Sequence, residues 1–362
     1  MPNDLKRQYE LHADEYRQKA IDVLDSGWYI LGNEVTEFEK EWALFVGTKY
    51  CVGLASGLDA LWMSFRILGI GKGDEVVVCA NAYIACVMGI TINGATPIFV
   101  EPDKYDNIDA SKIEAVITNR TKAILAVHLF GQACDMSKIM EIANKYNLRV
   151  VEDCAQSHGN HWNGQTVGSF GDIGCFSFYP SKGCGAFGDG GCIVTNSEDI
   201  DKKFRVYRNY GSEKRYYNQV VGSNSRLDEI QAGLLRVKLK YLDEMNQERC
   251  KIAERYSREI VNPDIVKPMI RPNADSSWHQ YVIHVCNKRR DELIEYLKLK
   301  GIGTLIHYPI PPHLSEAYKY LGYHEGSFPI AEKNAKEVLS LPMYNGMTYE
   351  EQTSIIEAIN NF

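Results

Sequence analysis

The sequence predicts an α/β protein with a mostly parallel sheet buried on both faces, followed by a smaller α+β domain. From about residue 49, short apolar segments alternate with helical segments, as in a parallel sheet with a helix after each strand. A long helical stretch over residues 226–260 then links this region to the rest of the chain. The 362 residues suffice for one large core and a second domain. We therefore expect a large domain over residues 1–240 and a smaller one over residues 241–362.

The expected elements follow the hydrophobic pattern along the chain. A polar helical segment over residues 4–26 and an amphipathic one over residues 33–45 come first. Strands of the large sheet are expected over residues 50–54, 75–79, 97–100, 123–127, 149–152, 175–178 and 191–195. Helices are expected over residues 56–68, 83–92, 109–117 and 136–146. In the smaller domain we expect strands over residues 281–285 and 304–306, and helices over residues 290–299 and 330–338.

Composition and charge exclude several classes of function. The net charge is −7 and there is no basic block, so we expect no nucleic-acid partner. The ten cysteines contain no C-x-x-C pair, which favours buried reduced thiols over a disulfide framework or a metal site. The N-terminal segment MPNDLKRQYE is polar, and no apolar run is long enough to span a bilayer. We expect a cytoplasmic protein without a membrane partner.

A single lysine, Lys182, lies between an aromatic strand end and a glycine-rich turn in CFSFYPSKGCGAFGDGG, residues 175–191. A desolvated lysine has a lowered pKa and can form a Schiff base. A lysine in a surface turn is the other interpretation, and the local sequence does not decide between them.

Four other features could bind a ligand beside this lysine. Ser56-Gly57 opens a helix after a strand, which suits a phosphate group or an ordinary N-cap. Asp153 follows an apolar strand, where it could pair with a buried cation or form a salt bridge in a loop. Tyr83 could stack on a flat ligand or pack in the core. Ser177, Gln156 and His158 could contact the same ligand, although a single histidine near a loop is more often structural.

Two loops are candidates for substrate binding. Residues 208–218 combine cations with tyrosines, which suits a diphosphate group or a solvated loop. Asn224 is a plausible cap of the long helix that follows. The segment HYPIPPH places His307 and His313 on a proline-rich loop, with no further ligand spaced to complete a metal site.

These features together fit pyridoxal phosphate. Its aldehyde reacts with a lysine, its pyridine nitrogen pairs with a carboxylate, its phosphate needs N–H groups, and its ring needs a stacking partner.

The segments VEDCAQSHG, SFYPSKGCGAFGDGG and GSNSRLDEIQAGLLRVKL make the chain resemble the sugar aminotransferases of the DegT/DnrJ/EryC1/StrS family. That family has the pyridoxal-phosphate fold type I, like aspartate aminotransferase. The resemblance implies that Lys182 binds the cofactor covalently and moves the proton, and that Asp153 pairs with the pyridine nitrogen. It also implies further cofactor contacts from Gln156, Tyr83, Ser56, Gly57 and Ser177, with Asn224 reaching the phosphate of the neighbouring subunit in a homodimer.

The segments NAYIA, SGLDAL and GIGTLIHYPIPPHL are similar to the subgroup that aminates C3 of dTDP-linked 3-keto-6-deoxyhexoses. This likeness implies L-glutamate as donor and slightly favours the galactose-configured product. We expect substrate contacts from Lys214, Arg215, Tyr216, His307 and His313. Two departures from the family pattern are Gly183-Cys184 after the lysine and Tyr83 at the stacking position.

Three alternatives remain open at the level of sequence: a C4-specific aminotransferase, a sugar dehydratase and a cofactor-binding regulator. Dehydratase relatives carry a histidine in place of the lysine, and regulators add a DNA-binding domain for which this chain has no residues to spare.

Overall fold

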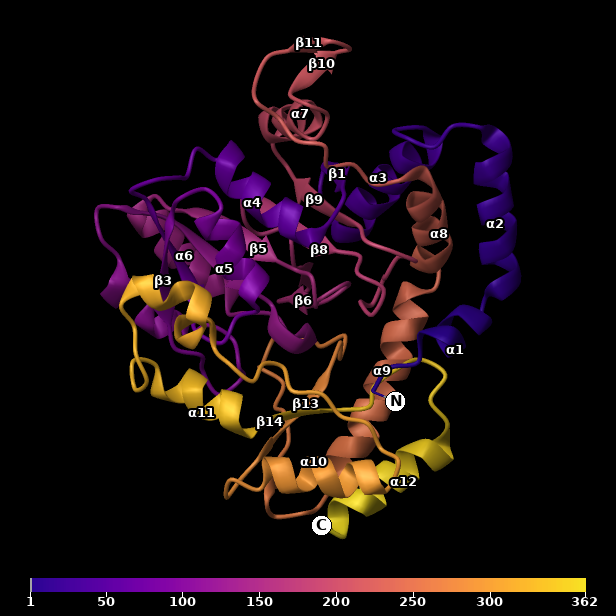
Figure 1. The fold of residues 1–362 in the computed structure, drawn as a ribbon, viewed down its shortest axis with the longest axis vertical. Helices are drawn as coiled ribbons and strands as arrows, with labels where there is room; N and C mark the ends of the chain where they lie inside the picture. Colours follow the sequence, from indigo (N-terminus) through magenta and orange to yellow (C-terminus); the bar gives the residue numbers. More distant parts are fainter. Residues whose placement is uncertain (1) are drawn as a thin grey trace.

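A seven-stranded sheet forms the centre of the larger domain in the computed structural model, which describes residues 2–362 (Figure 1). β9 runs antiparallel to both of its neighbours, and the other pairs of the series β8-β5-β4-β2-β3 are parallel. The predicted mostly parallel sheet is therefore confirmed. In spatial order the strands are β1 (Tyr50–Leu54), β9 (Gly191–Thr195), β8 (Ile173–Ser177), β5 (Arg149–Asp153), β4 (Thr121–Val127), β2 (Glu75–Cys79) and β3 (Thr96–Val100).

The strands of this sheet are apolar because helices cover both faces. Val76, Val77 and Val78 of β2 are all fully buried. The helices nearest in sequence to these strands are α3 (Asn33–Val46), α4 (Gly57–Ile67), α5 (Ile84–Thr91), α6 (Met136–Tyr146) and α7 (Glu198–Tyr207). Strands and helices share one large hydrophobic cluster, which fixes the carboxyl edge of the sheet as a rigid platform.

A second hydrophobic cluster lies in the C-terminal part of the chain. Here β12 (Ile265–Val266), β13 (Tyr281–Val285) and β14 (Val338–Leu341) form a small antiparallel sheet. The helices of this part are α10 (Arg290–Leu299), α11 (Pro329–Glu337) and α12 (Tyr349–Asn360). Helix α9 (Leu242–Glu259) runs from the larger domain into the smaller core (Figure 1).

Several expected elements differ in the structure. The stretch over residues 226–260 is two helices, α8 (Glu229–Leu239) and α9, because the chain leaves helical geometry at Tyr241, whose ring stacks on His12. Residues 4–26 likewise form α1 (Leu5–Glu10) and α2 (Ala13–Ser26). Residues 109–117 contain only two short 3-10 turns, and residues 304–306 contribute one bridge from Leu305 to Ser340. Helices α7 and α12 and strand β14 were not predicted.

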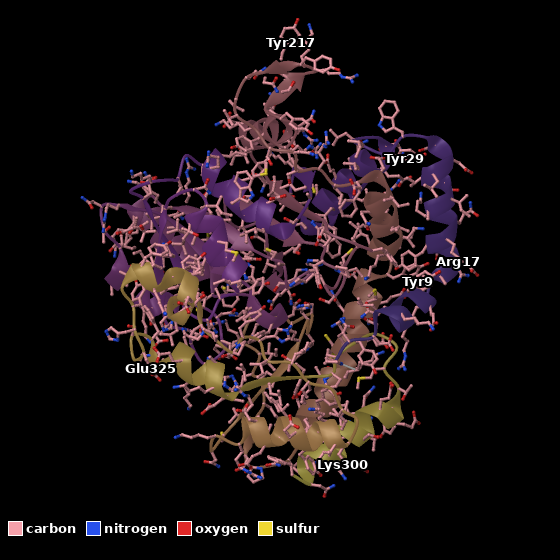
Figure 2. The ribbon with its side chains drawn as sticks, viewed as in Figure 1. Tyr9, Arg17, Tyr29, Tyr217, Lys300 and Glu325 are labelled. Atoms are coloured by element: carbon pink, nitrogen blue, oxygen red, sulfur yellow. The ribbon has the colours of Figure 1, made fainter. Side chains whose placement is uncertain are left out.

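A hairpin of residues 212–218 projects from the body of the larger domain (Figures 1 and 2). It consists of β10 (Ser212–Lys214) and β11 (Tyr217–Asn218), and residues 213–218 are exposed. Across residues 2–362 no helix combines the length and the apolar character needed to cross a bilayer.

Candidate active site

The strand ends at the carboxyl edge of the sheet bring Ser56, Gly57 and Ser177 together. Ser177 ends β8 and pairs with Gly191 of β9, which in turn pairs with Leu54 at the end of β1. A Cβ atom on Gly57 would lie 2.5 Å from the Ser177 Cβ. Glycine is thus required at residue 57 for the start of α4 to approach the end of β8 so closely.

The start of α4 has the features of an anion site. Ser56 is the N-cap, and its hydroxyl accepts a hydrogen bond from the Asp59 N–H at 3.1 Å. Ser225, from a distant part of the chain, stabilises this turn. Its hydroxyl donates to Asp59 Oδ2 at 2.7 Å and accepts from the Ala55 N–H at 3.1 Å. The positive end of the helix dipole and the first N–H groups therefore face the Ser177 hydroxyl, as a phosphate group requires.

Asp153 provides a buried carboxylate one strand away from Ser177. It ends β5, opposite Cys175 of β8, and 7% of its surface is exposed. Its Oδ2 accepts from the Cys86 thiol at 3.0 Å, and its Oδ1 accepts from the Ala155 N–H at 3.0 Å. Among residues 2–362 it forms no ion pair, so a cationic group bound beside it would gain a strong partner.

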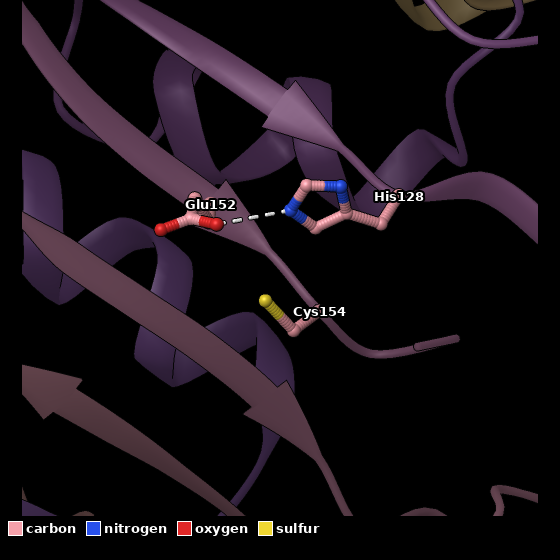
Figure 3. Close-up of side chains that lie close together, drawn as sticks. All are labelled: His128, Glu152 and Cys154. Carbon is pink, nitrogen blue, oxygen red and sulfur yellow. Dashed lines mark hydrogen bonds and ion pairs between the residues drawn. The ribbon is translucent and has the colours of Figure 1, made fainter. Parts of the chain in front are cut away.

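The adjacent carboxylate, Glu152, has a structural role (Figure 3). Successive strand residues point to opposite faces, and Glu152 is fully buried on the other side of β5. It accepts from the His128 ring at 3.1 Å. Its other bonds come from the N–H groups of Gly168, Phe170 and Gly171 at 2.7–2.8 Å. Although His128, Glu152 and Cys154 lie close enough to hold a metal ion, these bonds already occupy the carboxylate oxygens.

Lys182 lies in the loop of residues 179–190, which we call the lysine loop. The Lys182 N–H donates to the Tyr179 carbonyl at 2.8 Å, which closes a turn. Burial lowers the pKa of the Lys182 amine, and the nearby Asp153 and Cys86 oppose this effect. Within residues 2–362 its Nζ forms no hydrogen bond or ion pair, so the amine is free to react.

Lys238 is a buried lysine behind the same loop. Burial lowers its pKa to about 8. Its Nζ donates to the Gly185 carbonyl at 3.1 Å. Lys238 is thus engaged with the backbone, whereas Lys182 is not.

Gln156 and Tyr83 are linked through Tyr308 from the C-terminal part of the chain. The Gln156 side chain accepts from the Phe130 N–H at 2.7 Å and donates to the Tyr308 hydroxyl at 3.0 Å. The rings of Tyr83 and Tyr308 lie 4.9 Å apart at 32°. Tyr83 is the N-cap of α5 and remains 45% exposed, so it is accessible to a ligand.

The two histidines of the HYPIPPH segment have different surroundings. His307 bonds to the Ser340 hydroxyl at 2.8 Å, and burial together with the charge of Lys182 lowers its pKa to about 4. His313 is buried beside Phe99 and Phe328 and bonds to Glu332 at 3.1 Å. The structure therefore supports a position for His307 near Lys182, but the predicted substrate contact of His313 finds no support, because its ring is closed off within the core.

Four of the predicted site residues lie apart from the others within a single chain: Lys214, Arg215, Tyr216 and Asn224. The first three lie on the projecting hairpin, where Tyr216 is 82% exposed. Asn224 is exposed and forms a bridge with Asn209. It does not cap the long helix, since Asp228 is the N-cap of α8.

Sequence reasoning missed the contributions of Cys86 and Tyr308 and gave His158 little weight. Tyr308 lies in the proline-rich loop named above, but its contact with Gln156 depends on the tertiary structure. Cys86 carries no sequence signal beyond its apolar surroundings, and the segment around His158 does not show that its ring contacts the loop of Lys182.

Comparison with known proteins decides what kind of enzyme this arrangement serves. The model of the DegT/DnrJ/EryC1/StrS aminotransferase family matches residues 11–360. The chain belongs to this family. It is 50% identical over 360 residues to the dTDP-3-amino-3,6-dideoxy-alpha-D-galactopyranose transaminase of Aneurinibacillus thermoaerophilus, covering 99% of this chain and 98% of that protein.

Solved structures of family members agree with this assignment. DesV of Streptomyces venezuelae, in complex with a ketimine intermediate, superposes with a TM-score of 0.97 at 42% identity, covering 99% of this chain and 97% of that one. Ntda of Bacillus subtilis with bound cofactor PMP gives a TM-score of 0.91 at 31% identity, covering 99% of this chain and 83% of that one. The fold is thus the predicted fold type I, and the protein is an aminotransferase that uses pyridoxal phosphate.

Proposed function

We propose that the protein transfers the amino group of L-glutamate to C3 of a dTDP-linked 3-keto-6-deoxyhexose. The product would be a dTDP-3-amino-3,6-dideoxyhexose, with the galactose configuration favoured. The relative from Aneurinibacillus thermoaerophilus, which is named for a product of this kind, supports the choice of substrate.

One observation carries the assignment of the site. The Ser56-Gly57 helix start meets Ser177 at the sheet edge where Asp153 is buried with no ion pair among residues 2–362, and the charge of Asp153 acts on Lys182. The residues therefore fit the cofactor: the helix start and Ser177 for its phosphate, Asp153 for its ring nitrogen, and Lys182 for its aldehyde. When bound, the cofactor carries the amino group and withdraws electrons from the reacting carbon.

The residues of this chain then have separate tasks. Lys182 would move the proton between the cofactor and substrate carbons, and burial, which lowers the pKa of its amine, favours the neutral form that can accept a proton. Asp153 would keep the ring nitrogen protonated. Tyr83 would stack on the ring and Gln156 would contact the ring hydroxyl, and Tyr308 contacts both side chains.

The remaining predicted residues need a second subunit. We propose a homodimer in which Asn224 contacts the phosphate bound by the neighbouring subunit, and in which Lys214, Arg215 and Tyr216 contact the nucleotide sugar there. Their exposure in one chain supports this arrangement, since cations and aromatic side chains bind diphosphates and bases when they are brought to a site.

The experiment uses ¹⁵N-labelled glutamate with a panel of dTDP-linked 3-keto and 4-keto sugars, and identifies products by mass and NMR. The expected product carries ¹⁵N at C3. Three other outcomes would overturn the proposal. A label at C4 would indicate a C4 enzyme, and a deoxy sugar without nitrogen would indicate a dehydratase. No transfer from glutamate to the cofactor would indicate a regulator.

A further inference from the structure

Contacts within the lysine loop fix its two ends but not the backbone between them. It begins after β8 and returns to β9, with the Ala186 N–H bonded to the Phe178 carbonyl at 2.8 Å. Gly185 packs so tightly that a Cβ atom there would lie 2.3 Å from the Pro180 carbonyl oxygen. Between Lys182 and Gly185, the backbone needs partners from elsewhere to hold one conformation.

His158 provides one of these partners. Its Nδ1 accepts a hydrogen bond from the Cys184 N–H at 3.0 Å. The imidazole is 1% exposed and packs among the rings of Trp42, Phe176 and Phe178. Within the described part of the chain, its Nε2 has no hydrogen-bond partner. The bond from Cys184 therefore ties this buried ring to the loop that carries Lys182.

Lys238 holds the next residue of the loop from another side. It lies on α8 and is 6% exposed. Its Nζ donates to the Gly185 carbonyl at 3.1 Å. The N–H of Cys184 and the carbonyl of Gly185 are thus fixed by two buried side chains from two different segments, while the Cys184 side chain is itself fully buried.

The charge state of His158 suits this task. Only a neutral imidazole can accept a hydrogen bond at Nδ1. Burial, with the charges of Lys182 and Lys238, lowers the pKa of His158 to about 3. The acceptor therefore persists throughout the neutral range, and the ring takes no part in proton transfer there.

We propose that His158 and Lys238 are positioning residues that hold the Cys184–Gly185 backbone and thereby aim the Lys182 amine at the cofactor aldehyde. This inference rests on the proposed role of Lys182. Neither residue needs to touch the cofactor, because both act through the loop backbone.

The test compares His158→Asn with His158→Leu. Asparagine places a carbonyl oxygen near the position of Nδ1, whereas leucine removes the acceptor. In cofactor-free protein, amide exchange of the peptide covering residues 179–187 should become about tenfold faster in His158→Leu and stay near wild type in His158→Asn. On adding pyridoxal phosphate, covalent attachment, followed by visible absorbance, should slow by a similar factor only in the leucine variant.

Lys238→Met tests the second contact independently, and it should show the same faster exchange and slower attachment. His324→Leu, at an exposed histidine of the smaller domain, is the control and should match wild type. Unchanged exchange and attachment rates in both His158→Leu and Lys238→Met would overturn the proposal. The exchange measurement needs no cofactor, so its outcome is separate from that of Lys182→Ala, which tests the proposed role of the lysine.

Discussion

The sheet edge around Asp153 and the hairpin of residues 212–218 differ in how firmly their side chains are held. At the sheet edge, Ser177, Gly57 and Asp153 are fixed by strand pairing, close packing and buried hydrogen bonds. On the hairpin, Lys214 and Tyr216 are exposed and rest on little beyond their own strand pair. The first region is organised before any ligand arrives, whereas the second presents exposed side chains that another molecule could contact.

This difference separates the two halves of the proposed reaction. The cofactor chemistry depends on groups that one chain assembles, and preorganised groups lose little free energy when they act. In the proposed reaction, recognition of the nucleotide sugar would depend on the exposed residues of the hairpin. Changes at the sheet edge should therefore abolish chemistry, and changes on the hairpin should weaken substrate binding.

Lys182→Ala should have the largest effect. Without the amine, neither covalent attachment nor proton transfer is possible, so turnover should fall by at least about a thousandfold and the visible absorbance of attached cofactor should disappear. Steady-state assays and spectra of purified protein measure both. Retained turnover would contradict the role of this lysine.

Asp153→Asn should lower turnover on the order of a hundredfold, because an amide does not keep the ring nitrogen protonated. The neighbouring Glu152→Gln gives the matched contrast. It should lower the free energy of unfolding by roughly 1–3 kcal/mol, because its carboxylate holds three backbone N–H groups. Urea unfolding and kinetics of both variants separate the two roles, and equal kinetic losses in both would contradict the contrast.

Lys214→Ala should leave attachment of the cofactor unchanged and reduce kcat/KM for the nucleotide sugar by about tenfold or more. Mixing this variant with Lys182→Ala sharpens the test. If the hairpin serves the neighbouring subunit, subunit exchange should restore about a quarter of wild-type sites, since half the dimers are mixed and each has one intact site. If the mixture recovers no activity, the hairpin does not contribute to the site of the neighbouring subunit.

The smallest effect concerns acid stability. The pKa of His158 is near 3 in the folded protein and near its usual 6.5 when unfolded, so the unfolded state binds a proton first as the pH falls. Stability should therefore decrease below pH 6.5, by about 2 kcal/mol at pH 5 from this residue alone. Urea unfolding from pH 7 to 5 should show a flatter dependence for His158→Asn, and an unchanged slope would refute this account.

Sequence reasoning predicted the sheet edge well and the surroundings of the site poorly. Asp153 and Ser177 were within reach because each ends an apolar strand, and strand ends of a parallel sheet meet at one edge. The contacts of His158 and Tyr308 depend on which segments pack together, which a local pattern does not contain. The same limit explains the missed break at Tyr241 and the burial of His313, both set by distant partners.

The most direct test of the central claim is to identify the lysine that binds the cofactor. Borohydride reduction of the holoenzyme, followed by peptide mapping, labels the amine covalently attached at that moment. Lys238 is the sharpest rival, since its pKa is lowered like that of Lys182, but it already donates to Gly185. The account predicts the label on Lys182, and a label on Lys238 or on any other lysine would contradict it.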